Sequence, residues 1–235
     1  MSVVLGLDTA TATLTVAVTR DGTVLRQSDQ GPDPEGRPRH SALLLHELES
    51  CVDAAGGWDQ IGLIAVGLGP GSYTGLRIGI STARALAQAR EIPIAGVSTL
   101  AAVGLGIRGM KAAEDRDALP VLDARRDQAF AALYAPDGDE QWPPLVADPG
   151  ELADRVRDLG TNPLAAGDGS IRFREQLVAA GAEVVAAEDA AHRVMARHIC
   201  ALGEGAAVST PERIGPIYLR EPDAKRWLKP DARDD

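Results

Sequence analysis

Residues 67–79 read GLGPGSYTGLRIG, and this stretch decides the predicted fold. The continuous apolar run at 61–66 that precedes it is typical of a buried strand, and residues 76–90 have helical apolar spacing. The glycines of the turn allow backbone angles that other residues disfavour, and Pro70 stiffens the turn. The stretch therefore predicts a strand, a glycine-rich turn and a helix, as found in α/β proteins.

Regular elements are expected on both sides of this unit. Before it, an antiparallel meander of three strands leads to a proline-rich loop at 30–39 and a helix at 40–55. After it, strands and helices alternate, which predicts mixed sheets with helices packed against them. The other expected strands are 3–7, 13–19, 23–28, 92–97, 118–122, 128–134, 164–166, 183–185 and 214–219, and the other expected helices are 100–105, 151–159, 171–180 and 190–205.

The partial recurrence of this order indicates two related lobes, with a charged boundary near 106–117. We expect an N-terminal lobe at 1–105 and a C-terminal lobe at 106–189. A closing helix and strand at 190–219 should pack back on the lobes, and a flexible tail should follow at 220–235.

Composition restricts the function further. The chain has 235 residues and is 45% hydrophobic, which is enough for a substantial core. The formal charge of −10 argues against a protein that binds nucleic acid alone, because phosphate binding needs clustered Lys and Arg. The two cysteines are expected to be buried and reduced, and neither a signal peptide nor a membrane span is expected. We therefore expect a cytoplasmic protein without membrane contact.

Two interpretations of the glycine turn stay open. Free amides at a helix N-terminus can bind phosphate, and an acid with hydroxyls at the first hairpin turn could support a nucleotide. The residues of this weak, vestigial phosphate site are Asp8, Thr9, Gly69, Gly71, Ser72 and Thr74. The alternative is packing, because small residues four apart would let a second helix approach closely. These small residues are Gly75, Gly79, Ala83 and Ala87.

Other catalytic patterns are weak. The histidines occur as two pairs six residues apart, a spacing that does not place both on one helix turn as metal ligands. Asp123, Arg125, Arg126 and Asp127 are interpreted as a solvated charged turn rather than an acid/base pair. The sequence has no Gly-x-Ser-x-Gly motif. It is poorly equipped as an enzyme.

Several motifs together resemble one family over nearly the whole chain. They are LGLDTATATLTVAV, RHSALLLHELE, GLGPGSYTGLRIGISTARALA, GVSTL, LDARRDQAFAALY and PIYLR. The sequence resembles the TsaB (YeaZ) family, whose members are needed to make threonylcarbamoyladenosine on tRNA. The resemblance implies an actin-like, sugar-kinase-like fold of two lobes, each a mixed sheet flanked by helices.

The resemblance also implies a function. Members of the family are non-catalytic partners of the paralogue TsaD, which transfers threonylcarbamoyl to adenosine 37 of tRNAs that read ANN codons. The ATPase TsaE joins the complex, and this chain is expected to contact tRNA only indirectly, through the complex. A homodimer is expected when TsaD is absent. TsaD-like proteins carry a His-x-x-x-His metal pair, and the matching positions here are Thr99 and Val103, which cannot supply imidazole ligands.

The family places its partner interface on the helices at 41–55 and 76–90. The residues expected to bind the partner are Leu44, Leu48, Leu76, Arg77, Ile80 and Arg84. No tightly bound cofactor and no metal is expected, although ATP or ADP could bind weakly or between subunits. The alternatives are an actin-fold ATPase or small-molecule kinase that uses Asp8 and the glycine turn, and a metallopeptidase.

Overall fold

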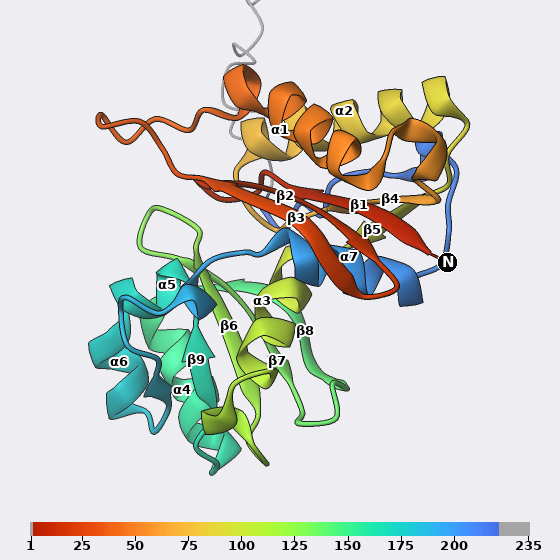
Figure 1. Cartoon of the computed structure of the whole chain (residues 1–235). Coiled ribbons are helices and arrows are strands. Elements are labelled where there is room, and N and C mark those ends of the chain that lie inside the picture. The colour runs from red at the N-terminus through yellow and green to blue at the C-terminus, as the bar shows by residue number, and fades with distance from the viewer. Residues whose placement is uncertain (1, 221–235) are drawn as a thin grey trace, which may run out of the picture.

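A computed structural model describes residues 2–220 of the chain. Two five-stranded mixed sheets form its framework (Figure 1). The first sheet has the order β3-β2-β1-β4-β5 and the second has the order β10-β9-β6-β7-β8. We call the first sheet with helices α1 and α2 the first lobe, and the second sheet with helices α4, α5 and α6 the second lobe.

The first lobe is built around β1. All six residues of this strand are buried, because β1 lies in the centre of the sheet between antiparallel β2 and parallel β4. Leu5 is paired with Val18 on one side and with Ile64 on the other. The elements of this lobe are β1 (Val3–Asp8), β2 (Leu14–Arg20), β3 (Thr23–Gln30), α1 (His40–Ala55), β4 (Leu63–Gly67), α2 (Tyr73–Arg90) and β5 (Ile94–Val97).

The second lobe repeats the meander and the following parallel strands. Its elements are β6 (Ala118–Asp123), β7 (Ala129–Tyr134), β8 (Glu140–Ala147), α4 (Pro149–Leu159), β9 (Leu164–Ala166), α5 (Asp168–Arg172), α6 (Arg174–Ala179) and β10 (Glu183–Val184). The sequence did not predict β8, because Pro143 and Pro144 are typical of loops. β8 pairs only with β7, so it is an edge strand, where missing N–H groups are tolerated.

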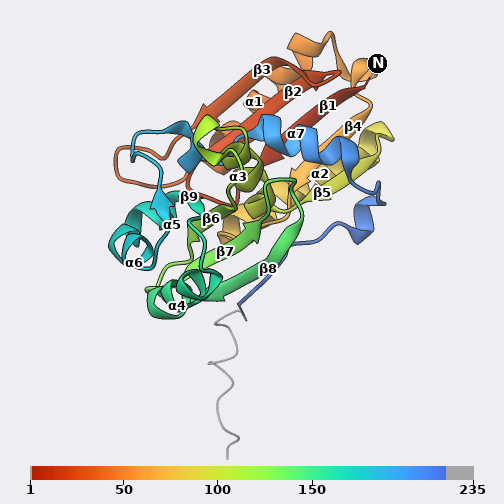
Figure 2. The ribbon, with the colours of Figure 1, turned by 90° about the horizontal axis from the view of Figure 1, so that it is seen from below.

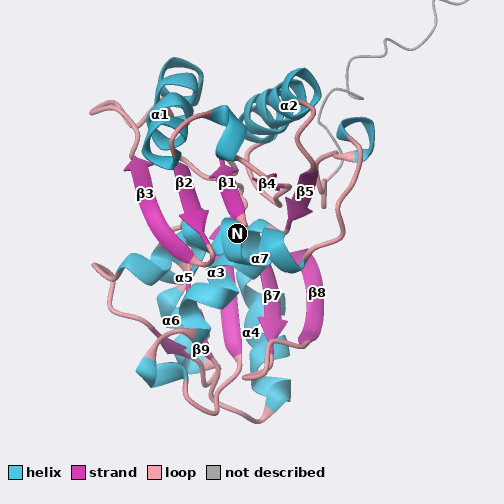
Figure 3. Ribbon diagram, turned by 45° about the vertical axis from the view of Figure 1, so that its right-hand side comes forward, coloured by secondary structure: helices cyan, strands magenta, loops and turns pink. Residues whose placement is uncertain are grey.

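Two helices lie between the sheets. α3 (Thr99–Arg108) packs against β6 and β7, and α7 (Ala196–Gly205) packs against β1, β2 and β4. These two helices also pack against each other, so they join the lobes (Figure 3). Figure 2 shows α7 lying across the lower face of the first sheet. The resulting order of layers is helices, sheet, helices, sheet, helices.

Some predicted elements are wrong. Residues 214–219 form no strand, because Gly215 and Pro216 interrupt the run and only Ile217 donates a backbone hydrogen bond to the first lobe. The helix predicted at 171–180 consists of α5 and α6, and α7 begins six residues later than predicted, at Ala196. Of the predicted tail at 220–235, residues 221–235 lie outside the described part of the chain.

None of the helices within residues 2–220 is long and apolar enough to span a lipid bilayer.

Candidate functional site

The glycine turn connects β4 to α2. The helix begins at Tyr73, three residues earlier than predicted. Gly69 has φ of +94°, a left-handed conformation that favours glycine. The hydroxyl of Ser72 accepts a hydrogen bond from the amide of Gly75 at 3.2 Å, so Ser72 is the N-cap of α2. Thr74 is not the cap and lies exposed in the first helical turn.

The small-residue face of α2 packs inside the first lobe. Thr9 Oγ1 donates to the carbonyl of Gly75 at 2.8 Å. A Cβ atom on Gly75 would overlap the carbonyl oxygen of Thr9, and one on Gly79 would overlap Thr9 Oγ1. Ala83 and Ala87 are also buried. This face is closely packed, as the packing interpretation expects, but Gly75 and Gly79 lie against the first hairpin of the same chain and not against a second helix.

Asp8 is a buried connector. Its exposed fraction is 1%, Thr99 Oγ1 donates to its Oδ2 at 2.6 Å, and the amide of Ala10 donates to its Oδ1 at 2.7 Å. The amide of Gly69 donates in turn to Thr99 Oγ1 at 3.1 Å. Asp8 therefore ties the end of β1 to the glycine turn and to the start of α3. Burial raises the pKa of Asp8 to about 6, against the opposing effect of the two hydrogen bonds.

This pKa predicts a pH dependence of stability. The folded state holds the Asp8 proton more tightly than the unfolded chain, in which the carboxyl has its usual pKa of 3.8. This preference stabilises the folded state fully below pH 3.8, and the stabilisation is lost as the pH rises through about 6. One pKa unit corresponds to about 1.4 kcal/mol, so the contribution of Asp8 to the free energy of unfolding should fall by roughly 3 kcal/mol. Urea unfolding of the wild type and of Asp8→Asn across this range measures the effect. If the free energies of unfolding of the two proteins changed in parallel with pH, the prediction would be contradicted.

The predicted phosphate-binding residues lie together, but most of their polar atoms are engaged within the chain. The amide of Ser72 donates to the carbonyl of Ala10 at 2.7 Å. A Cβ atom on Gly71 would overlap the same carbonyl oxygen, so the first hairpin turn fills the space in front of the glycine turn. Within this group Gly71, Ser72 and Thr74 line an adjoining cavity, whereas Asp8 and Thr9 are directed into the interior.

That cavity has a volume of about 620 Å³ and lies between the lobes. It is enclosed by the β1–β2 turn, the start of α2, the β6–β7 turn, the start of α5 and the C-terminal segment. Its walls are formed by Ala10, Thr11, Ala12, Pro38, Gly71, Ser72, Tyr73, Thr74, Leu122, Asp123, Ala124, Arg125, Arg126, Phe130, Asp168, Ile217, Tyr218, Leu219 and Arg220.

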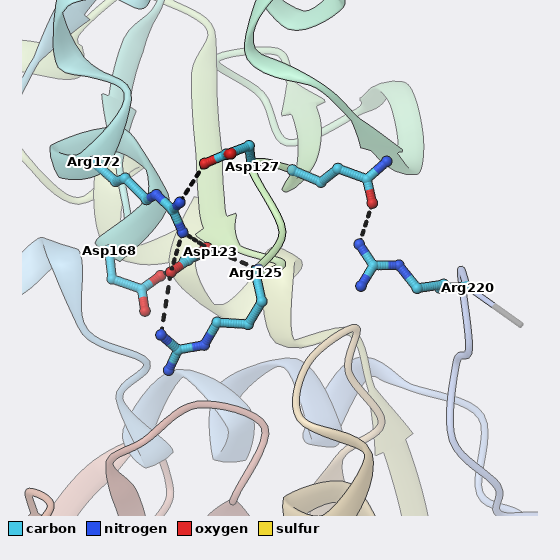
Figure 4. Close-up of polar contacts among 7 residues, drawn as sticks. Asp123, Arg125, Asp127, Asp168, Arg172 and Arg220 are labelled. Carbon is cyan, nitrogen blue, oxygen red and sulfur yellow. Dashed lines mark hydrogen bonds and ion pairs between the residues drawn. The ribbon is translucent and has the colours of Figure 1, made fainter. Parts of the chain in front are cut away.

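The charged β6–β7 turn is held by ion pairs (Figure 4). Arg172 contacts Asp123 at 2.9 Å and Asp127 at 2.5 Å, and Asp168 accepts the amide of Asp123 at 2.9 Å. Arg125, Arg126 and Asp127 all have φ between +51° and +62°, which is unusual for three consecutive non-glycine residues. The sequence identified the charged turn but not Asp168 and Arg172, because they come from a distant helix.

A second cavity, of about 440 Å³, lies on the outer side of the first lobe between α1 and α2. Leu45, with 66% of its surface exposed, and half-buried Ile78 provide apolar surface there. We call this surface the α1–α2 groove. Its lining residues are His40, Ser41, Leu44, Leu45, Arg77, Ile78, Ser81 and Thr82.

Four of the six predicted partner-binding residues belong to the core. Leu44, Leu48, Leu76 and Ile80 have exposed fractions of 1%, 1%, 0% and 3%. These side chains pack against the first sheet of their own chain, because helical apolar spacing marks the side of a helix that faces its sheet. Their part in binding a partner stays a prediction. Arg77 is exposed and lines the groove, and Arg84 is half-buried. Leu45 and Ile78, which the sequence did not single out, provide the exposed apolar surface of the groove.

The positions compared with the TsaD metal pair serve other purposes. Thr99 has an exposed fraction of 0% and uses its hydroxyl for Asp8 and Gly69, while Val103 lies in the core between the sheets. Among residues 2–220, no group of three or more His, Cys, Asp and Glu side chains is placed to hold a metal ion.

Comparisons with known proteins identify the family. The model of the family described as TsaD, tRNA N6-adenosine threonylcarbamoyltransferase, matches residues 25–227. A relative from Escherichia coli, the tRNA threonylcarbamoyladenosine biosynthesis protein TsaB, is 31% identical over 239 residues, covering 96% of this chain and 97% of that protein. The chain belongs to the TsaB (YeaZ) family. The resemblance found in the sequence is confirmed, and the match to the TsaD model fits a paralogue.

Solved structures support the same family and confirm the fold. A Pseudomonas aeruginosa protein described as similar to peptidase YeaZ has a TM-score of 0.78 and 27% identity, covering 94% of this chain and 100% of that chain. A ROK hexokinase from Thermus thermophilus has a TM-score of 0.51 and 14% identity, covering 86% of this chain and 98% of that chain. The predicted sugar-kinase-like fold of two lobes is therefore correct. The TsaB relatives support a role in threonylcarbamoyladenosine biosynthesis.

Proposed function

We propose that this chain is a non-catalytic subunit that binds TsaD and activates it to transfer threonylcarbamoyl to adenosine 37 of tRNAs that read ANN codons. The observation that carries the proposal is the α1–α2 groove. Leu45 and Ile78 form an apolar surface around a cavity, rimmed by Arg77, Ser81 and Thr82. An apolar centre with a polar rim is the arrangement of a protein–protein interface.

The interior of the first lobe supports the non-catalytic part of the proposal. In a kinase, an acid at the end of β1 would need to reach bound metal and phosphates. Here Asp8 accepts hydrogen bonds from Thr99 and Ala10 and is 1% exposed. The amide of Ser72, a candidate phosphate donor, is bonded to Ala10. These contacts give the residues a structural role, which favours a scaffold over an independent ATPase or kinase.

Activation is proposed to occur through conformational selection. The α1–α2 groove is proposed to bind the active conformation of TsaD more tightly than its other conformations. Binding then shifts TsaD towards the active conformation. We further propose that TsaE joins the complex and that this chain contacts tRNA only indirectly, through the complex. In the absence of TsaD, the groove is proposed to support a homodimer. ATP or ADP would bind weakly or between subunits, with no tightly bound cofactor, and the complex would act in the cytoplasm.

Reconstitution tests this function. The cognate TsaD and TsaE are incubated with threonylcarbamoyl-AMP and an ANN-reading tRNA, with and without this chain, and the modified nucleoside is quantified by mass spectrometry. We expect no modification by this chain alone, and modification by TsaD that depends on adding it. Full modification in its absence, or transfer by this chain alone, would contradict the proposal.

A further inference from the structure

The C-terminal segment is first attached to the first lobe. The amide of Ser209 donates to the carbonyl of Ile94 at 2.8 Å, so the segment covers the exposed edge of β5. Ile214 is 5% exposed and belongs to the core between the first sheet and its two outer helices. The amide of Ile217 donates to the carbonyl of Leu68 at 2.7 Å. Up to Ile217, therefore, the segment is anchored to the first lobe.

Tyr218 is still held by the first lobe, and the two residues after it reach the core between the sheets and the second lobe. Tyr218 stacks on Tyr73 at the start of α2, with ring centroids 5.2 Å apart and planes inclined by 28°. Leu219 packs against the core between the two sheets. The guanidinium of Arg220 donates to the side-chain oxygen of Gln128, which follows the charged β6–β7 turn (Figure 4). These residues also form one wall of the 620 Å³ cavity.

We propose that residues 214–220 form a latch that holds the two lobes together over this cavity and can detach while both lobes stay folded. α3 and α7 join the lobes through a buried core, whereas the latch spans the cavity with no helix or strand. Detachment would remove this wall of the cavity, while the packing of α3 and α7 would still join the lobes.

The contacts beyond Ile217, one to α2 of the first lobe and the others towards the second lobe, explain why this end of the latch would detach. Tyr73 and Tyr218 are 44% and 42% exposed, so their stacking removes only part of each ring from water. Leu219 is only partly buried, and Arg220 makes its contact to an uncharged side chain. Ile214, in contrast, is almost fully buried at the other end. Segments with few buried apolar contacts open at low free-energy cost.

The distance between the lobes provides the test. Spin labels are attached to Ala89→Cys on α2 and Glu175→Cys on α6, both exposed positions, and the distance distribution is measured by double electron–electron resonance. The native Cys51 and Cys200 are buried, and burial raises the pKa of their thiols to about 11 and about 12, so they should react slowly with the label. The full-length labelled chain is compared with its Tyr218→Ala/Arg220→Ala variant.

We expect one narrow distribution for the parent and a second, longer distance for the variant. Hydrogen exchange at the Ile217 amide should also accelerate roughly tenfold. The control is Val208→Ala, at a 62%-exposed position before the latch, which should behave like the parent. An unchanged distribution in a folded variant would overturn the proposal. A variant that fails to fold would overturn it as well, because the latch is proposed to detach from folded lobes.

Discussion

Replacing Gly75 with alanine will lower the free energy of unfolding by about 3 kcal/mol, although Gly75 lies within helix α2. Helix propensity alone would give the opposite sign, since alanine is favoured over glycine inside a helix by about 1 kcal/mol. The loss is expected because the added Cβ would overlap the carbonyl oxygen of Thr9, a backbone atom that can move only if the β1–β2 turn moves. Equilibrium urea unfolding of the wild type and of Gly75→Ala measures this difference in the free energy of unfolding.

The matched control is Gly205→Ala. Gly205 is the last residue of α7, and a Cβ atom there would meet nothing within 4 Å. Its substitution should change the free energy of unfolding by no more than about 0.5 kcal/mol. If Gly75→Ala instead stabilised the isolated chain and weakened TsaD binding, the small face of α2 would be a partner surface after all, and its assignment to the interior would be wrong.

Replacing Leu45 with aspartate should weaken the complex with TsaD at least about 100-fold, since central interface residues contribute on the order of 3 kcal/mol. Leu45 is 66% exposed on the free chain, so burying the new carboxylate against a partner carries a cost that arises only on binding. The stability of the isolated chain should stay within about 0.5 kcal/mol of the wild type. Calorimetric titration with TsaD and urea unfolding measure the two quantities.

Val178→Asp serves as the control for this prediction. Val178 is 52% exposed on α6 of the second lobe, away from the α1–α2 groove, and the same change in charge there should leave the affinity for TsaD unaltered. Equal weakening by both variants would indicate a general effect of charge. Unchanged binding by Leu45→Asp would remove the groove from the proposed interface.

Local patterns predicted the elements whose signals are strong. The bounds of α1 were predicted as 40–55 and observed as His40–Ala55, because apolar spacing and the following glycines both mark its end. The edge strand β8 was missed because its prolines are compatible with a strand only where one side is unpaired, and that depends on the rest of the sheet. The strand predicted at 214–219 failed for a related reason, since it has no neighbouring strand with which to form a ladder.

The candidate sites were predicted less well. Apolar periodicity on α1 and α2 identified Leu44, Leu48, Leu76 and Ile80, which cover the first sheet, and could not distinguish that surface from one for a partner. Leu45 and Ile78 lie beside this core stripe, and only the packing of the helices on the sheet shows that they stay uncovered. Asp8 was identified from its place at a strand end, but its contact with Thr99, 91 residues away, depends on the tertiary fold.

The mass of the complex in solution tests the central claim most directly. The full chain is mixed with its cognate TsaD in equal amounts, and the molar mass is measured by light scattering on a sizing column, with each protein alone as reference. The proposed function predicts a new species that contains both chains, reduced or absent with Leu45→Asp and retained with Val178→Asp. Separate elution of two folded proteins at micromolar concentration would contradict the claim that this chain is a subunit of TsaD.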